Sequence, residues 1–230
     1  MVKFIEKTHQ YFNDNHKEYI SGTRFIHKFE FPFDEDGISK RVALKEGISQ
    51  DEVLKKWKAI SKKACDYGTK IHALMENYIK FGETDELYSS LYSSFDKITK
   101  EEFSTAKEIL SEHLLYDDEY EIAGTADLII VHDDKEFSIG DFKTNKSIDF
   151  YNPYGNRMLD PVDHLSSCNY NIYSLQLSLY AYMFSKLTGL KCRRVFIIYK
   201  NNEKFEYIST TNMEYEIRMM LKYYKKHLKK

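Results

Sequence analysis

The sequence predicts an α+β protein of the α/β/α kind, in which helices flank a central mixed β-sheet. Three observations predict this fold class: short apolar runs separated by acidic turns in mid-chain, helical periodicity on either side of them, and two Ser/Thr-x-x-Glu helix starts. Only three prolines and nine glycines occur among 230 residues, and no stretch has the composition of a linker. We therefore expect one domain over residues 1–230, with an N-terminal β/helical extension of about residues 1–48 packed on its core.

Helix caps and strand periodicity give the order of the expected elements. Ser49 with Glu52 and Thr99 with Glu102 are capping boxes, so a helix is expected to begin at each. Gly68 is expected to interrupt the first of these helices. The expected elements are two or three short strands before residue 35; helices over 49–67, 69–82 and 99–112; strands over 113–122, 124–134 and 135–145; a helix over 173–189; strands over 193–200 and 204–211; and a helix over 212–230.

Composition argues against a membrane protein and against a cysteine-based metal site. No stretch approaches the roughly 18–20 apolar residues that span a bilayer, and no basic-then-apolar leader is found, so we expect a cytoplasmic protein without membrane association. The three cysteines, at positions 65, 168 and 192, form no CxxC pair, so neither a zinc knuckle nor an iron–sulfur set is expected. A net charge of −2 gives no global basic field, so attraction to a polyanion would have to be local.

Two acids and a lysine lie on the hairpin expected over residues 124–145. Side chains alternate between faces along a strand, so Asp141 and Lys143 share one face. Asp127 and Asp141 each lie seven residues from Asp134, and a turn centred there would make them near-opposite neighbours, about 5 Å apart at Cβ. Two carboxylates this close repel each other and raise the pKa of at least one.

The residues alone leave two interpretations of this cluster open. One is a surface hairpin with an Asp–Lys pair, which stabilises a protein by at most ~1 kcal/mol. The other is a site for Mg²⁺ or Mn²⁺, because a hard divalent cation removes the repulsion and prefers oxygen ligands. A lysine beside the ion would then hold or polarise a water, or neutralise a transferring phosphoryl group.

Two helical pairs of polar residues favour the second interpretation. His72 and Glu76 are four residues apart, so on a helix they lie one above the other. Gln176 and Tyr180 have the same spacing, and we expect them on the face opposite the apolar residues of their helix. The alternatives are a structural histidine and an ordinary polar helix face. The functional interpretations are a metal ligand and a ridge that contacts a phosphate backbone.

Four short motifs occur in an order shared with a known enzyme superfamily. They are GTKIH (68–72), GTADL (124–128), GDFKTNK (140–146) and SLQLSLY (174–180). With the sequence around them, from about residue 9 to 200, they resemble the RecB-like branch of the PD-(D/E)xK nuclease superfamily, most of all phage-encoded exonucleases and the related mitochondrial genome-maintenance exonuclease. The resemblance implies a restriction-endonuclease-like core. Ala126 replaces the signature proline before the first acid, and the cysteines that some members use for an iron–sulfur cluster are missing, so no cluster is expected.

The resemblance also implies roles for individual residues. His72, Asp127 and Asp141 would be metal ligands together with the Phe142 carbonyl, and Lys143 would orient or activate the attacking water. Glu76 is a further candidate, as a ligand of a second metal or as a residue of the outer shell, and Thr144 would hold the scissile strand. Gln176 and Tyr180 would contact the DNA strand and support Lys143. Lys146 and Arg157, which follow the motif, are the candidates for the lining of a DNA-binding groove.

The implied function is that of a DNA exonuclease, with one or two Mg²⁺ or Mn²⁺ ions, that hydrolyses phosphodiester bonds at single- or double-stranded ends of linear DNA. Its setting would be phage replication or DNA recombination, repair or replication, in the cytoplasm of a bacterial or phage-infected cell. A helicase, an annealing protein or a single-strand-binding protein would be its partner. The alternatives are a structure-specific endonuclease with the same site and a DNA-binding module of the same fold that does not cut.

Overall fold

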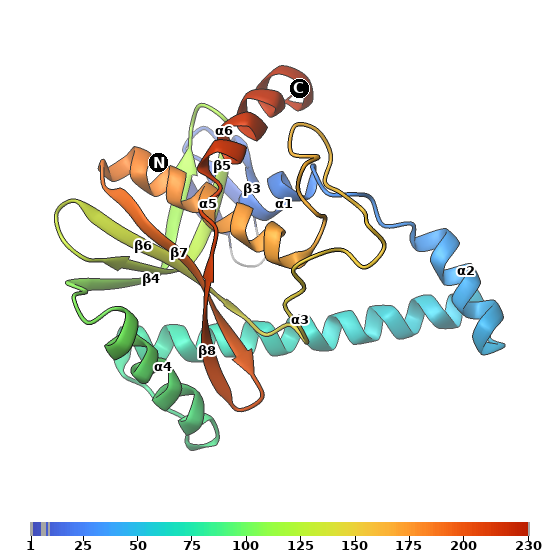
Figure 1. Cartoon of the computed structure of the whole chain (residues 1–230), viewed down its shortest axis with the longest axis horizontal. Helices are drawn as coiled ribbons and strands as arrows, with labels where there is room; N and C mark the ends of the chain where they lie inside the picture. Colours follow the sequence, from blue (N-terminus) through green and yellow to red (C-terminus); the bar gives the residue numbers. More distant parts are fainter. Residues whose placement is uncertain (1, 6–7, 9, 230) are drawn as a thin grey trace.

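The computed structural model describes residues 2–5, 8 and 10–229, and its centre is an eight-stranded mixed sheet (Figure 1). The strands are β1 Val2–Ile5, β2 Gln10–Asn13, β3 Glu18–Ser21, β4 Glu108–Asp117, β5 Ile122–Val131, β6 Glu136–Lys143, β7 Lys191–Asn201 and β8 Lys204–Thr210. The helices are α1 Gly22–His27, α2 Glu35–Glu46, α3 Gln50–Phe81, α4 Ser89–Glu102, α5 Asn169–Thr188 and α6 Glu214–Tyr223, with a short 3-10 turn at Glu86–Tyr88 and a π-helical turn at Tyr224–Leu228. The predicted α+β fold class is confirmed.

The central strand of the sheet is β5, because three other strands pair with it. β4 pairs antiparallel along its full length, whereas the opposite edge of β5 is shared between β3 and β6. β3 pairs parallel at Ile122 and Ala123, and β6 pairs antiparallel from Leu128 to Val131. β7 then pairs parallel with β6, and β8 antiparallel with β7. On the β3/β6 edge, residues 124–127 have no strand partner among the described pairs, which leaves a gap in the strand pairing, and the ring of Tyr180 packs against Gly124 there.

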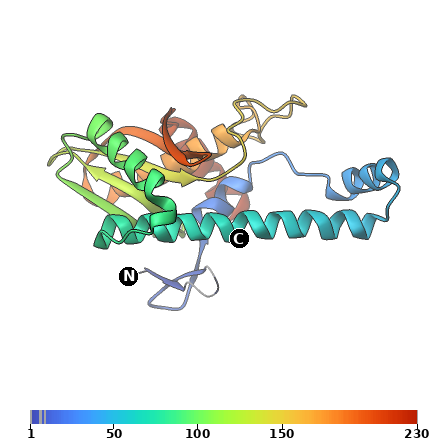
Figure 2. The ribbon, with the colours of Figure 1, turned by 90° about the horizontal axis from the view of Figure 1, so that it is seen from below.

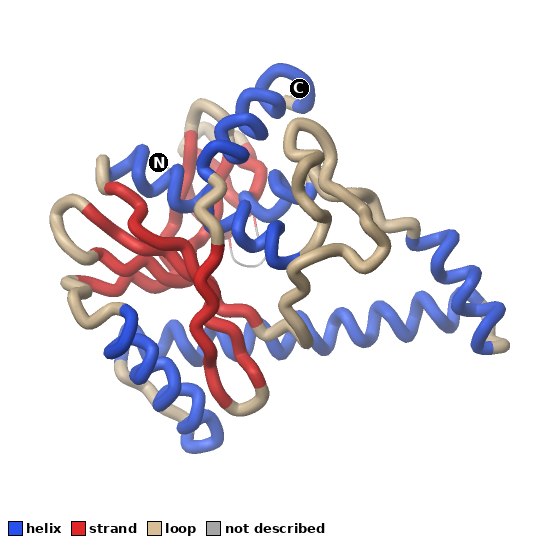
Figure 3. The backbone as a smooth tube through the Cα atoms, viewed as in Figure 1, coloured by secondary structure: helices blue, strands red, loops and turns tan. Residues whose placement is uncertain are grey.

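Alternation of side chains along the strands gives the sheet two apolar faces. Phe137 and Ile139 of β6 belong to a core that contains α1, α5 and α6. Phe142 of the same strand belongs to the opposite core, which contains α3 and α4, and its ring centroid lies 5.7 Å from that of Phe95. Figure 3 shows the resulting layers, with α5 and α6 on one side of the strands and α3 and α4 on the other.

α3 is one continuous helix of 32 residues, so the predicted interruption at Gly68 is wrong. The capping box of Ser49 and Glu52 at its start and the left-handed Gly82 at its end agree with the prediction. An interior glycine costs a helix about 1 kcal/mol but does not end it while the backbone stays right-handed. A Cβ at position 68 would lie 3.3 Å from Oγ1 of Thr144, so the glycine allows α3 to pass close to the end of β6.

The helix predicted over 99–112 is also wrong, because α4 ends where that helix was expected to begin and β4 follows. The Thr99 hydroxyl donates to the Phe95 carbonyl inside α4, at 3.0 Å, instead of capping a new helix. The sequence predicted a β/helical extension over about residues 1–48 but gave bounds to none of its helices, and the structure places α1 and α2 there. The three N-terminal strands, the β5–β6 hairpin, and the later strands and helices match the expected order.

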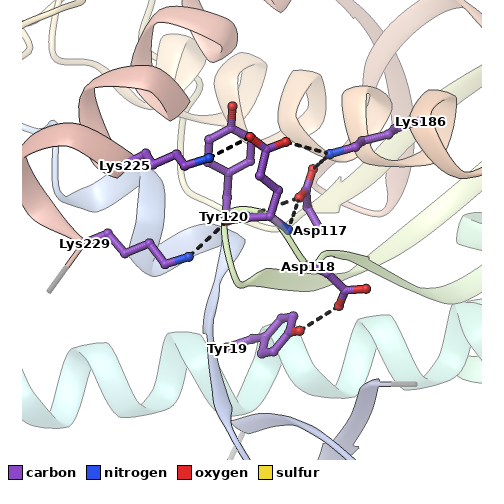
Figure 4. Close-up of polar contacts among 8 residues, drawn as sticks. Tyr19, Asp117, Asp118, Tyr120, Lys186, Lys225 and Lys229 are labelled. Atoms are coloured by element: carbon purple, nitrogen blue, oxygen red, sulfur yellow. Dashed lines mark hydrogen bonds and ion pairs between the residues drawn. The ribbon is translucent and has the colours of Figure 1, made fainter.

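Ion pairs tie the turn between β4 and β5 to the C-terminal helices (Figure 4). Asp117 is buried and accepts a 2.8 Å hydrogen bond from Lys186 of α5. Lys225 donates to the carboxylate of Glu119 at 3.0 Å, and Lys229 donates to the backbone carbonyl of the same residue at 3.0 Å. Two of the C-terminal lysines therefore make contacts inside the molecule.

α2 and the N-terminal half of α3 extend beyond the sheet as a helical arm (Figures 1 and 2). Residues 58–67 are exposed on every side of the helix, and the chain becomes buried again from Ile71. α3 thus enters the core at the point where it passes the end of β6. Within the described part of the chain, no helix has both the length and the apolar character needed to cross a bilayer.

Candidate active site and metal centre

The two acidic strand positions face each other as predicted. The last pair of the β5–β6 ladder is Leu128 with Gly140, so the next positions in this register are Asp127 and Asp141. Backbone pairing stops there, because the Phe142 N–H donates to Oδ2 of Asp127, at 2.8 Å, and not to a backbone carbonyl. β6 stays in the sheet beyond this point through its parallel pairing with β7. The gap in the strand pairing of β5 therefore begins at the two carboxylates.

His72 of α3 lies at this gap in the strand pairing and contacts both β5 and β6. Its Nδ1 lies 3.2 Å from Oδ2 of Asp127, and its Nε2 lies 3.0 Å from the Phe142 carbonyl oxygen. Burial acts to lower the pKa of His72, but the attraction to Asp127 outweighs burial and raises the pKa to about 9. The imidazole is therefore charged at neutral pH in the metal-free protein and balances one of the acids.

Asp141 and Lys143 form a buried ion pair, with side chains that are 7% and 16% exposed. Burial acts to lower the pKa of Lys143, but the neighbouring Asp141 outweighs it and raises that pKa. Burial and repulsion from Asp127 raise the pKa of Asp141 to about 6. Burial acts to raise the pKa of Asp127 as well, but the positive His72 lowers it. Asp141 therefore shows the raised pKa that was predicted for one of two adjacent carboxylates. Among the described residues, no hydrogen bond of good geometry is made to its Oδ2.

Glu112 of β4 is a third acid of this site, and the sequence did not predict it. The β4–β5 ladder skips this residue, which has a φ of 52° and lies opposite Asp127 in the register. One ligand atom each from His72, Glu112 and Asp127 lie within 4.8 Å of one another. Burial and the charge of Asp127 raise the pKa of Glu112 to about 7. The sequence did contain a signal for it, because Glu112 is an acidic residue within a largely apolar segment. Residues 99–112, however, were predicted to be a helix that ends at Glu112.

The donor set fits a divalent cation. An ion of the size of Mg²⁺ holds its ligands at about 2.0–2.1 Å, so neighbouring ligands in an octahedral shell lie about 3 Å apart. Nδ1 of His72 and Oδ2 of Asp127, 3.2 Å apart, have this spacing, and a ligand atom of Glu112 lies within 4.8 Å of both residues. Asp141 and Glu112 both have raised pKa values, because negative charge is concentrated in a buried place. A cation would remove this repulsion.

Glu76 and Thr144 lie near the site but make other contacts. Glu76 accepts a 2.6 Å hydrogen bond from Lys80, one turn further along α3. Its negative charge also acts to raise the pKa of Glu112. Thr144 directly follows β6 and lies against Gly68 of α3. The proposed roles of Glu76 and Thr144 stay predictions.

The polar ridge predicted on α5 is wrong for Tyr180, which is buried in the main core. A Cβ at Gly22 or at Gly124 would lie 2.5 Å from Cε1 of this ring, so both glycines make room for it. The distance from Nε2 of Gln176 to the Tyr180 hydroxyl is 3.4 Å. Tyr180 therefore packs α5 against α1 and β5, whereas Gln176 is only half-buried. The expectation of a surface position failed because α5 is covered on most of its circumference.

The two basic residues after the motif lie in the long loop between β6 and α5. Lys146 is exposed, and its backbone carbonyl accepts a 3.0 Å hydrogen bond from the Tyr199 hydroxyl. Arg157 is exposed as well, but its guanidinium donates to the His164 carbonyl at 2.9 Å and so braces the loop itself. DNA contacts by either residue stay predictions.

The solved structures that are similar over most of the chain include two crystal structures. No protein-family model and no curated protein matches the sequence. The crystal structure of SSO0001 superposes with a TM-score of 0.39 and 14% identity, covering 91% of this chain and 75% of its own. The crystal structure named "Putative exonuclease" from Eubacterium rectale has a TM-score of 0.39 and 14% identity, with coverages of 88% and 77%. Similarities at this level assign neither a family nor an activity to the chain.

Proposed function

We propose that this chain is a metal-dependent DNA exonuclease that hydrolyses phosphodiester bonds at the ends of linear DNA. The observation that carries the proposal is the convergence of Asp127, Asp141 and His72, from two strands and a helix, beside the ammonium of Lys143. The resemblance of the four motifs to the RecB-like branch of the PD-(D/E)xK superfamily supports the same function. Three of these motifs contain the two aspartates, the histidine and the lysine of the site.

The residues that would hold Mg²⁺ or Mn²⁺, as one or two ions, are the acids Asp127, Asp141 and Glu112, one ring nitrogen of His72, and the Phe142 carbonyl. When bound, such an ion stabilises negative charge on a phosphate and lowers the pKa of a coordinated water towards neutrality. His72 must give up a proton to become a ligand, since the imidazole is charged in the metal-free protein.

The role of Lys143 in this proposal is to hold the attacking water and to place positive charge near the phosphate. Its ammonium has three N–H donors, and the ion pair with Asp141 occupies one side of it. No other ion pair of this ammonium is found among the described residues, so its remaining donors would bind a water and a phosphate oxygen. Because the lysine side chain is only 16% exposed, these interactions would be stronger than they are in bulk water.

DNA would lie across the end of β6, beside Asp141 and Lys143, and continue along the loop that follows this strand. Thr144, Lys146 and Arg157 of this loop and the half-buried Gln176 of α5 are the proposed contacts. The setting we propose is phage replication or DNA recombination, repair or replication in the cytoplasm of a bacterial or phage-infected cell. A helicase, an annealing protein or a single-strand-binding protein would then supply or protect the DNA ends.

The test compares end-labelled linear DNA with closed circular DNA, each with Mg²⁺, Mn²⁺ or EDTA. An exonuclease degrades only the linear DNA, and only with the metal. Loss of the circular DNA would instead identify an endonuclease. Retarded but intact DNA under every condition would identify a binding module and contradict the proposal. Asp134→Ala is the matched control for changes at Asp141, because Asp134 belongs to the same hairpin but its side chain is 95% exposed at the turn.

A further inference from the structure

The ammonium of Lys143 lies between a carboxylate and an aromatic ring. Asp141 contacts it from the same strand, and the ring of Tyr173 lies on another side, with its centroid 4.5 Å from Nζ. Tyr173 is half-buried on α5, which covers this face of the sheet. None of the motifs gives a role to this tyrosine.

A ring in this position restricts where the ammonium can point. A lysine side chain has four rotatable bonds and, without contacts, would sample many positions of Nζ. The face of an aromatic ring attracts a cation, but it offers no acceptor of the strength of a carboxylate or a water. The ring therefore holds Nζ in place and leaves N–H donors for groups on the open side of the site.

The other candidate for this task makes different contacts. Gln176, one turn along α5 from Tyr173, has its amide 3.4 Å from the Tyr180 hydroxyl, and no contact between Gln176 and Lys143 occurs among the described residues. Among the described residues, the ion pair with Asp141 and the ring contact with Tyr173 are the interactions found for the Lys143 ammonium.

We propose that Tyr173 is a positioning residue for the nuclease reaction, whose ring fixes the Lys143 ammonium so that its free donors face the attacking water. This inference rests on the proposed function and adds to it a residue that acts through the lysine and not on the DNA or the metal. It requires the ring of Tyr173 and not its hydroxyl.

Three variants test the proposal by their kinetics with Mg²⁺ and linear DNA. Tyr173→Leu removes the ring, and we expect kcat to fall about tenfold with KM within twofold of the wild type. Tyr173→Phe keeps the ring and should retain at least about half of kcat. Tyr182→Leu is the matched control: it removes a partly buried tyrosine of the same helix, whose ring lies 5.1 Å from Arg218, away from the site. Tyr182→Leu should lower the free energy of unfolding about as much as Tyr173→Leu does, but it should leave kcat unchanged.

A second measurement does not depend on activity. The side-chain NMR signals of Lys143, assigned by their loss in Lys143→Arg, should show a ring-current shift in the wild type and in Tyr173→Phe. The shift should vanish in Tyr173→Leu. Equal kcat for Tyr173→Leu and wild type, or unchanged Lys143 signals in Tyr173→Leu, would overturn the inference. A wild type without metal-dependent cleavage but with the ring-current shift would overturn the proposed function and leave the contact itself established.

Discussion

The backbone N–H of Phe142 donates a 2.8 Å hydrogen bond to Oδ2 of Asp127, at the point where the β5–β6 ladder ends. A side chain here takes the place of a backbone acceptor, so the two strands separate while the acid remains fixed. The Phe142 carbonyl, on the other side of the same residue, faces Nε2 of His72. One peptide segment thus orients a carboxylate and an imidazole around the place where a cation would bind.

Removing either member of the Asp141–Lys143 pair should abolish cleavage. We expect Asp141→Ala and Lys143→Ala to lower kcat by about 10²–10³-fold or more, because each loses a charge that acts on the reacting phosphate or on the metal. DNA retention without metal and the circular dichroism spectrum should stay close to those of the wild type, as they should in the control Asp134→Ala. A wild-type cleavage rate in either variant would refute the site.

His72→Ala should weaken metal binding more than it affects the fold. The imidazole has a pKa of about 9 and must lose a proton to bind a cation, so at pH 7 His72 should release close to one proton on binding, beside a fraction of a proton from Glu112, whose pKa is about 7. Calorimetry of Mn²⁺ binding in buffers of different ionisation enthalpy measures this release. In His72→Ala the release should fall by about one proton, and half-maximal cleavage should need about tenfold more Mg²⁺. An unchanged Mg²⁺ titration would remove His72 from the site, and His164→Ala serves as a control at an exposed histidine.

Glu112 should make the metal-free protein less stable as the pH rises from about 4.5 to 7. Its pKa is about 7 in the folded state against an ordinary 4.5, so over this window the unfolded chain has lost the proton that the folded chain still holds. Stability falls with pH wherever the unfolded state binds fewer protons. Glu112→Gln should therefore raise Tm at pH 8 in EDTA by about 2–5 °C.

Saturating Mn²⁺ should remove the same loss of stability in the wild type, because the cation neutralises the acids that repel one another. Thermal unfolding at pH 5 and pH 8, with EDTA or Mn²⁺, measures both effects. Glu108→Gln changes an exposed acid of the same strand and should leave Tm unchanged. An identical pH dependence in Glu112→Gln and wild type would show that Glu112 is not held in the buried acid cluster.

Gly124→Ala should destabilise the fold through the ring of Tyr180. The added Cβ would lie 2.5 Å from Cε1 of a ring that is itself buried, so one of the two must move. We expect a loss of about 1–3 kcal/mol in the free energy of unfolding. In a Tyr180→Ala background the same substitution should cost clearly less, because the steric conflict is gone. Equal costs in the two backgrounds would contradict this account of the glycine.

The sequence determined the parts of the site that depend on local pairing. A hairpin turn around Asp134 is enough to bring Asp127 opposite Asp141, and strand alternation is enough to put Lys143 on the face of the second acid. The capping box at Ser49 and the left-handed Gly82 likewise set the ends of α3, because caps depend on residues only a few positions apart.

Tertiary structure alone decided the remaining members of the site. Glu112 approaches Asp127 through a positive φ in β4, which no periodicity reveals. α3 continues through Gly68 because one interior glycine costs a helix only about 1 kcal/mol while its backbone stays right-handed. Tyr173 meets Lys143 because α5 packs over β6, and the same packing buries Tyr180. These contacts join segments distant in the chain, so they follow from how whole helices and strands pack and not from the pattern within any one of them.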